Sequence, residues 1–199
     1  DADKGVTHSI ASTCNMNDPT DVGPNLDLIK AFICTDGKDW QTSAVANAAD
    51  FTLSNLIKTR DARFEASFYN KPTPRAKSCY LYVTKFIPRS ALEYIEKGGS
   101  PAPEFQGEKN VTGYPVIRYA EVLLIYAEAM AMQDKLTEAL EALNEVRDRV
   151  DLPAVSASTK TEFMKLLRHE RMVELAFEGH RFWDLRRWGL ATTVLNGTH

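Results

Sequence analysis

The C-terminal half of the chain repeats its apolar residues at helical spacing. Residues 116–132 are apolar except for Arg118, Glu121 and Glu128, which fall within roughly an 80° sector of one helix. A helix that is apolar on nearly all sides is expected to be central and surrounded by neighbours. Its three charges need partners, because unpaired buried charge is costly. Pro115 suits the first turn of this helix, where a missing amide hydrogen does no harm.

A second, amphipathic helix is predicted over 137–150. Its apolar stripe consists of Ala139, Leu143, Val146 and Val150. On its other side, Glu145 and Arg149 have the i,i+4 spacing of a stabilising ion pair. The two helices are expected to form a hairpin with tetratricopeptide-like spacing. Because one such hairpin cannot bury both of its faces, we expect its neighbours to lie upstream of residue 1 or in a partner.

A third helix is predicted to begin at a capping box. Thr159 and Glu162 are spaced so that each side chain can bond the exposed backbone amide of the other. The helix is expected to run to Glu178, and Gly179 is the natural left-handed residue after it. One or two further helical turns are predicted over 181–188.

The remaining residues, 1–114, lack sustained periodicity and predict an irregular, loop-rich lobe of short elements. These elements are helices at 25–32 and 50–59, and strands at 64–69 and 80–86. The expected fold class is mainly α, with a few short strands. The expected organisation is a lobe over 1–114 and a helical region over 115–199.

The densest stretch, residues 167–189, mixes charged and aromatic side chains. His169-Glu170 fits the start of a zinc-binding His-Glu-x-x-His motif, but Val173 stands where the second histidine must be. Glu170, Glu174 and Glu178 are spaced like a carboxylate rail, yet nearby arginines would keep them ionised and unsuited to proton donation. We therefore predict a structural ion-pair and aromatic network, comprising Arg118, Glu121, Glu128, Arg168, Glu170, Arg171, Glu174, Glu178, Arg181, Trp183, Asp184, Arg186, Arg187 and Trp188.

Composition narrows the function classes. The net charge of −3 and pI near 5.9 give no electrostatic footprint for nucleic acid. Cys14, Cys34 and Cys79 are far apart and lack CxxC spacing, so isolated thiols are expected in place of a zinc site. No phosphate-binding loop, dinucleotide fingerprint or Gly-x-Ser-x-Gly elbow is present, and no cofactor or metal is expected.

One loop residue is a candidate for ligand binding. Trp40 follows the turn signal Asp36-Gly37 and could stack against a sugar or another ligand ring. A lone loop tryptophan is more often partly buried packing, and both readings stay open.

The helical motifs resemble the SusD/RagB family of cell-surface lipoproteins. The first matching stretch is Tyr114–Ala129, with Tyr114-Pro115-Val116-Ile117-Arg118-Tyr119-Ala120-Glu121 at its start. The second is Ala142–Arg149, and the most specific runs from Arg168 through Phe177-Glu178-Gly179-His180-Arg181-Phe182-Trp183-Asp184-Leu185-Arg186-Arg187-Trp188-Gly189. Weaker similarity lies at Asp36-Gly37 and at Arg60-Asp61-Ala62-Arg63-Phe64.

The resemblance implies a non-catalytic binder with tetratricopeptide-like helix pairs. Such a protein is anchored by lipid to the outer membrane and passes an oligosaccharide, or in some members a peptide, to a SusC-like TonB-dependent transporter. The family's anchoring cysteine and first helix pairs are not in this chain, which we therefore expect to be a fragment. Asp151 replaces the family's usual helix-ending glycine, so aspartate is expected to adopt the left-handed turn there.

Four functional hypotheses follow. We favour a surface glycan-binding protein that serves a transporter. The alternatives are a tetratricopeptide-like scaffold for a protein partner, or a peptide-binding member of the same family. A glycoside hydrolase that uses paired carboxylates is the least favoured reading.

Overall fold

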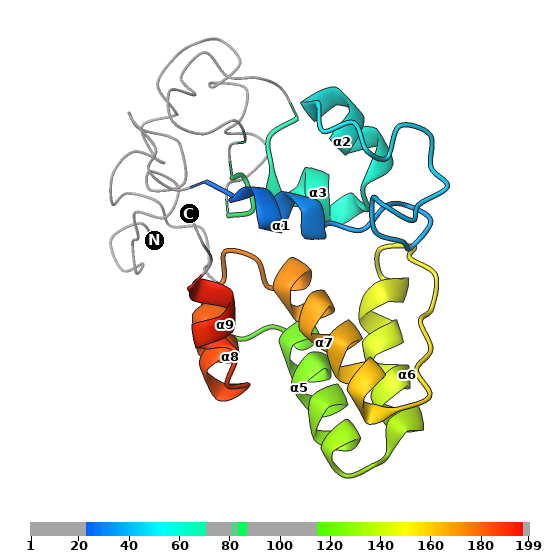
Figure 1. Cartoon of the computed structure of the whole chain (residues 1–199), viewed down its shortest axis with the longest axis vertical. Coiled ribbons are helices and arrows are strands. Elements are labelled where there is room, and N and C mark those ends of the chain that lie inside the picture. The colour runs from blue at the N-terminus through cyan, green and yellow to red at the C-terminus, as the bar shows by residue number, and fades with distance from the viewer. Residues whose placement is uncertain (1–22, 71–80, 82, 87–114, 197–199) are drawn as a thin grey trace, which may run out of the picture. The chain divides into compact units, whose positions relative to one another are not determined.

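The computed structural model describes residues 23–70, 81, 83–86 and 115–196, and within them the protein is mainly helical (Figure 1). The chain divides into two compact units, Asp1–Val116 and Ile117–His199. The predicted mainly helical class is confirmed. The predicted strands are not present among the described residues, which carry only two isolated antiparallel bridges, Cys34 with Arg60 and Phe68 with Val83.

Among its described residues, the first unit contains three short helices, α1 (Leu26–Ala31), α2 (Leu53–Thr59) and α3 (Ala62–Ser67). The side chain of Asn25 caps α1 by accepting the Leu28 amide at 2.9 Å, as its position predicts. The rings of Phe32, Phe64 and Phe68 pack with centroids 5.0–5.6 Å apart and form the centre of this unit's core.

The strand predicted over 64–69 is wrong, because α3 occupies that segment. Phe64 and Phe68 satisfy both an alternating pattern and the four-residue spacing of a helix face. Asp61 decides between them: its carboxylate accepts the Arg63 amide at 2.9 Å and caps α3. Within the second predicted strand, 80–86, the described residues show only the bridge at Val83.

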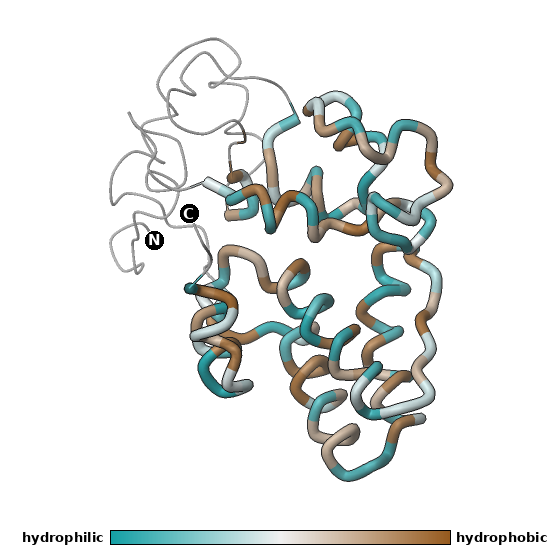
Figure 2. The backbone as a smooth tube through the Cα atoms, in the orientation of Figure 1, coloured by the Kyte–Doolittle hydropathy of each residue, from teal (hydrophilic) through white to brown (hydrophobic). Residues whose placement is uncertain are grey.

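The second unit contains α5 (Tyr119–Met132), α6 (Leu136–Asp148), α7 (Lys160–Glu174), α8 (His180–Arg187) and α9 (Ala191–Leu195). Helices α5, α6 and α7 lie side by side in Figure 1 and share one apolar core. Leu124, Leu143, Phe163 and Leu167 are fully buried in it. Figure 2 shows apolar and polar positions interleaved along these helices, as expected for helices that each bury one face.

Helix α5 begins later than predicted and is less enclosed. Pro115 is not in its first turn, because Arg118 is the extended N-cap residue and its carbonyl accepts the Glu121 amide. Helices α6 and α7 cover one side of α5. Its other side is exposed, so the prediction of a helix surrounded on all sides is wrong for the described chain.

Left-handed residues end the later elements. Asp151 has φ +56° after α6, which confirms the predicted left-handed aspartate, and the Leu152 amide bonds back to the Arg147 carbonyl at 3.1 Å. Helix α7 begins at the predicted capping box but ends at Glu174, four residues before the predicted end. Phe177 has φ +65°, which continued helix does not allow. Gly179, at φ +82°, then turns the chain into α8.

Candidate functional site

Two places in the described structure bring together side chains that could bind a ligand or take part in catalysis. One is the loop that carries Trp40, and the other is the charged segment that joins α7 to α8. They lie in different units and are described separately.

The Trp40 loop is held rigid by aspartates that bond its own backbone. Asp36 accepts the Ala44 amide at 2.8 Å, the Ser43 hydroxyl at 3.0 Å and the Lys38 amide at 3.2 Å. Desolvation acts to raise the pKa of Asp36, but these hydrogen bonds outweigh it and lower the pKa. Asp39 caps the turn beyond by accepting the Gln41 amide at 2.9 Å.

Trp40 itself is half-buried and lies beside Phe51 and Lys30. Its ring meets Phe51 edge-on at 5.2 Å, and the Lys30 ammonium lies 6.0 Å from its centroid. The Arg60 guanidinium lies 5.3 Å from the centroid of the same Phe51 ring. The loop therefore presents one ordered, partly exposed tryptophan. The neighbours Phe51 and Lys30 were not singled out from sequence, because nothing in their spacing links them to Trp40.

Arg60, which lies beside Phe51, is held by hydrogen bonds to three other residues of the first unit. Its side chain is buried and donates to the Ala48 carbonyl at 2.9 Å, to the Thr59 hydroxyl at 2.8 Å and to the Cys34 sulfur at 3.3 Å. Burial lowers the pKa of Arg60, and the neighbouring Cys34 acts in the opposite direction. Cys34 is a free, buried thiol, while Cys14 and Cys79 lie outside the described residues.

In the second unit, Arg118 and the two glutamates of α5 each lie within 4 Å of a titratable side chain. The Arg118 guanidinium contacts the Glu174 carboxylate at 2.6 Å and the Glu178 carboxylate at 2.6 Å. Burial acts to lower the pKa of Arg118, but these two glutamates outweigh it and raise the pKa. Glu121 lies 3.6 Å from the His180 imidazole, and Glu128 pairs with Arg187.

Glu128 accepts hydrogen bonds from two consecutive residues, Arg187 and Trp188. Arg187 contacts its carboxylate at 2.5 and 2.7 Å, and the Trp188 indole donates to it at 2.8 Å. Burial acts to raise the pKa of Glu128, but these hydrogen bonds outweigh it and lower the pKa. Arg187 also packs over the Trp188 ring at 4.5 Å, and Arg168 lies over the same ring at 5.3 Å.

Buried charged side chains of α7 form ion pairs with two other helices, α6 and α8. Arg171 forms a two-point contact with Asp184 of α8, with distances of 2.9 and 3.0 Å. Glu170 accepts from Arg147 of α6 at 3.0 Å. The three glutamates do not share one cation, because Glu174 and Glu178 contact Arg118 whereas Glu170 pairs with Arg147.

Two contacts in this network differ from expectation. Arg149 does not pair with Glu145 but with Glu174, at 2.7 and 2.8 Å. Arg147, which was not among the predicted network residues, is buried and central to it. Its sequence signal is its place four residues after Leu143, on the buried stripe of α6.

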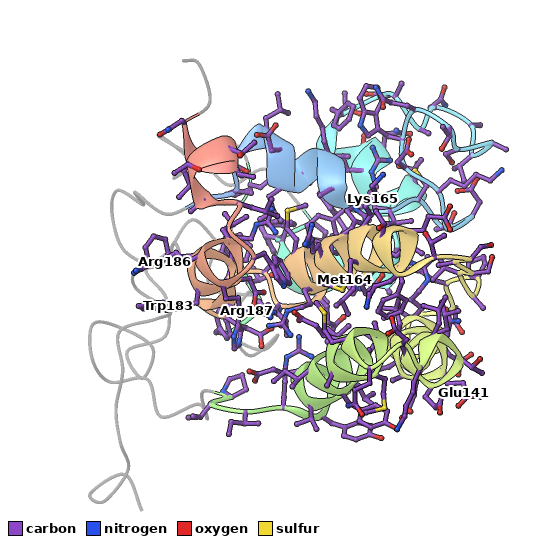
Figure 3. The ribbon with its side chains drawn as sticks, turned by 60° about the horizontal axis from the view of Figure 1, so that its bottom comes forward. Glu141, Met164, Lys165, Trp183, Arg186 and Arg187 are labelled. Carbon is purple, nitrogen blue, oxygen red and sulfur yellow. The ribbon has the colours of Figure 1, made fainter. Side chains whose placement is uncertain are left out.

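Trp183 and Arg186 lie outside the ion-pair network. Figure 3 shows both side chains pointing away from α7, on the outer side of α8. Trp183 is 63% exposed and meets Phe182 edge-on, with Arg186 5.7 Å from each ring. Arg181 is half-buried near Asp184, and burial lowers its pKa. The predicted network therefore includes two residues that the structure places on the surface.

The carboxylates of this segment are arranged for structural ion pairing. Glu128, Glu174 and Glu178 each contact an arginine at 2.5–2.6 Å, which favours the ionised form over a proton-donating acid. The described residues contain no group of three or more His, Cys, Asp or Glu side chains placed to hold a metal ion. None of the described helices has the length and apolarity to cross a bilayer.

A model of the SusD family matches residues 94–199, just over half of the chain. The chain belongs to the SusD family. The match contains α5 to α9 and the whole ion-pair network around Arg171. The ion-paired charges of the second unit therefore lie within the part of the chain that matches the family.

Individual relatives agree with this assignment. SusD-like protein P38 of Formosa agariphila is 37% identical over 93 residues, which is 42% of this chain and 18% of the relative. A SusD-like carbohydrate binding protein of Bacteroides fragilis has 30% identity and a TM-score of 0.67, over 87% of this chain and 36% of that one. A second SusD-like protein of B. fragilis has 27% identity and a TM-score of 0.65, over 86% and 37%. The chain thus spans less than a fifth of the curated relative and just over a third of the solved chains.

Proposed function

We propose that the protein is a non-catalytic, cell-surface binding protein that captures oligosaccharides or polysaccharides for uptake. The observation that carries this proposal is membership of the SusD family, together with similarity at 30% identity to a SusD-like carbohydrate binding protein. The pairing of the carboxylates with arginines also favours binding over hydrolysis, because general acid catalysis needs a carboxyl that can hold a proton.

We assign glycan contact to the Trp40 loop. Sugar rings bind through stacking on aromatic faces, and a binding loop gains affinity when its shape is fixed before the ligand arrives. Asp36 and Asp39 fix this loop through bonds to its own backbone, and Phe51 fixes the Trp40 ring. Lys30 adds a cation beside the ring, at 6.0 Å from its centroid. Trp40 is thus an ordered aromatic on a loop, as a binder of sugars requires.

The test is a glycan-array screen followed by calorimetry on the best ligand, with Trp40→Ala and a matched control. Trp183→Ala is that control, because it removes an equally large and more exposed indole from α8. We expect Trp40→Ala to weaken binding about tenfold or more, as loss of a ring stack does. We expect Trp183→Ala to bind like the parent. Weaker binding by Trp183→Ala, with Trp40→Ala unchanged, would place the glycan site on α8. Failure of the parent protein to bind any glycan would refute the proposal.

Delivery to a SusC-like TonB-dependent transporter is the next step of the same proposal. It implies an outer-membrane location at the cell surface, through a lipid anchor. Co-purification of a transporter of this class with the full-length protein is the expected result. Recovery of the protein from the periplasmic fraction alone, without the transporter, would contradict it.

The exposed side of α5 favours one alternative, a scaffold that binds a protein or peptide. Several apolar side chains of α5 are about half exposed, among them Val122 and Ile125. A protein-binding scaffold would retain its partner in pull-down experiments after substitution of Trp40 and would bind no glycan in the array. Peptide ligands in the same calorimetric assay distinguish a peptide-binding member of the family.

A further inference from the structure

Two cations lie beside the aromatic rings of the Trp40 loop in the described part of the chain, and they differ in how far their charge is available to a ligand. The Arg60 guanidinium lies beside Phe51, but Arg60 is only 2% exposed, and both of its terminal nitrogens donate hydrogen bonds to protein atoms. The Lys30 ammonium lies 6.0 Å from the Trp40 centroid, and Lys30 is half-buried. Among the described residues, Lys30 forms no ion pair. Lys30 is therefore the cation that a ligand on Trp40 can meet.

The aspartates of the Trp40 loop are engaged with the loop itself. Both carboxylate oxygens of Asp36 accept hydrogen bonds from donors of the loop, at 2.8–3.2 Å. One oxygen of Asp39 accepts two backbone amides of the same loop, at 2.9 and 3.1 Å. These hydrogen bonds to ionised groups hold the two carboxylates toward the loop backbone. Neither aspartate forms an ion pair with Lys30, so a positive charge is left beside the Trp40 ring.

The contact between Lys30 and Trp40 can be exchanged for an ion pair with a ligand. A separation of 6.0 Å is at the outer limit of a cation–π interaction, so little free energy is lost when the ammonium turns away from the ring. A lysine ammonium is a compact charge with three rotatable donors on a flexible stem. Such a donor suits the oxygens of a carboxylate or a sulfate, which accept strong charge-assisted hydrogen bonds.

We infer that the Trp40 site prefers glycans that carry a negative charge, with the indole stacked on a sugar ring and the Lys30 ammonium paired with a carboxylate or sulfate substituent. This preference rests on the proposed function, because it concerns the same site. A uronic acid supplies the carboxylate and a sulfate ester supplies the sulfate, and the same ammonium pairs with either. A neutral glycan would use the stacking part of the site and leave Lys30 without a partner from the ligand.

The test is an array that carries each charged oligosaccharide beside its neutralised form. Uronic acid oligosaccharides are paired with their carboxyl-reduced forms, and sulfated oligosaccharides with their desulfated forms, so the two sources of charge are separated. The best charged ligand and its neutralised form are then compared by calorimetry for the parent protein and for Lys30→Gln, Lys30→Arg and Lys38→Gln. The melting temperature of each variant is the control for folding.

Lys38→Gln is the matched control for the loss of charge. Lys38 lies in the same loop, two residues from Trp40, and its charge interacts with Asp36. The substitution removes the same single charge from the unit as Lys30→Gln does, but at a side chain that has no described contact with the Trp40 ring. Lys30→Arg keeps the charge at its place and tests whether the cation itself is what matters.

We expect the parent to bind the charged member of at least one pair more tightly than its neutralised form. Lys30→Gln should weaken binding of the charged ligand about fivefold, the upper end for an ion pair at a half-exposed site, and should leave binding of the neutralised ligand within about twofold of the parent. Lys30→Arg and Lys38→Gln should both bind the charged ligand within about twofold of the parent, because each leaves a cation beside Trp40.

Three results would overturn the preference for charged glycans and leave the proposed glycan binding intact. The first is a parent protein that binds the neutralised ligands as tightly as the charged ones, or more tightly. The second is a Lys30→Gln variant that keeps the parent's preference. The third is a loss in Lys38→Gln as large as that in Lys30→Gln, because the net charge of the unit would then be the cause. If the parent binds no member of any pair, the proposed function fails and the preference fails with it.

Discussion

Truncation of Arg171 tests whether the charges between α7 and α8 hold the fold. The Arg171 and Asp184 side chains are only 4% and 6% exposed, and two hydrogen bonds of 2.9 and 3.0 Å join them. Arg171→Ala leaves the Asp184 carboxylate buried with one of its partners removed. Breaking a buried pair in this way typically costs about 3–5 kcal/mol, because the remaining charge stays desolvated.

The structure places the expected value at the lower end of that range, about 3 kcal/mol. Arg187 still donates to Asp184 at 2.8 Å after the truncation and retains part of the compensation. The Nη1 atom of Arg171 is also buried and has no hydrogen-bond partner among the residues described, so the pair is not ideally satisfied to begin with. A loss of about 3 kcal/mol corresponds to a melting temperature lower by about 6–12 °C in a chain of this size.

The assay is thermal unfolding followed by tryptophan fluorescence in a Trp40→Phe background. This background confines the signal to Trp183 and Trp188, which lie in the same unit as Arg171. The control is Arg186→Ala, which removes an exposed arginine of α8 that lies outside the network and should change stability by less than about 0.5 kcal/mol. If Arg171→Ala and Arg186→Ala have the same melting temperature, the buried ion pair does not stabilise this unit and the reasoning fails.

Three further predictions concern single features of the second unit. Thr159→Ala removes the cap of α7 and should cost about 1 kcal/mol in urea unfolding, whereas Thr161→Ala, inside the first turn, should cost less. Gly179→Ala should cost about 1 kcal/mol through its φ of +82° alone, because no atom lies within 4 Å of the added Cβ; a stability equal to the parent would contradict this. Arg187→Gln should destabilise the protein at pH 7 more than at pH 3. The folded pKa of Glu128 is below its unfolded value, so the stabilisation is full above the unfolded pKa of about 4.3 and is lost as the pH falls through the folded pKa. An Arg187→Gln effect of equal size at both pH values would show that the pair does not depend on the ionised carboxylate.

The sequence predicted the long helices of the second unit because their signals are local. Thr159 and Glu162 form the capping box that their spacing requires, and Asp151 and Gly179 adopt the left-handed turns expected of them. The end of α7 was missed because Phe177 carries no such signal. Nothing in a phenylalanine indicates φ +65°, a conformation that surrounding contacts must impose.

The short helices of the first unit were harder to predict. Over six residues, Phe64, Ala66 and Phe68 fit an alternating strand as well as a helix face, and only the Asp61 cap separates the two. The same ambiguity affects site residues. Trp183 and Trp188 share a charged motif, but the Trp188 indole reaches Glu128 while Trp183 is exposed. Which side of α8 meets α5 is a tertiary property, and residue spacing within one helix does not determine it.

Placement of the charges explains how one short segment can hold the second unit together. Arg118 lies at the start of α5, and its partners Glu174 and Glu178 lie at the end of α7 and just before α8. Glu128, more than two turns along α5, reaches Arg187 at the end of α8. Arg171 of α7 and Arg187 of α8 meet on the same carboxylate, that of Asp184. Helix α8 is thus fixed to α5 and to α7 mainly by charge and little by apolar packing, since Leu185 is its one buried apolar side chain among the described residues. A fold joined in this way can expose Phe182 and Trp183 without losing the arrangement of its helices.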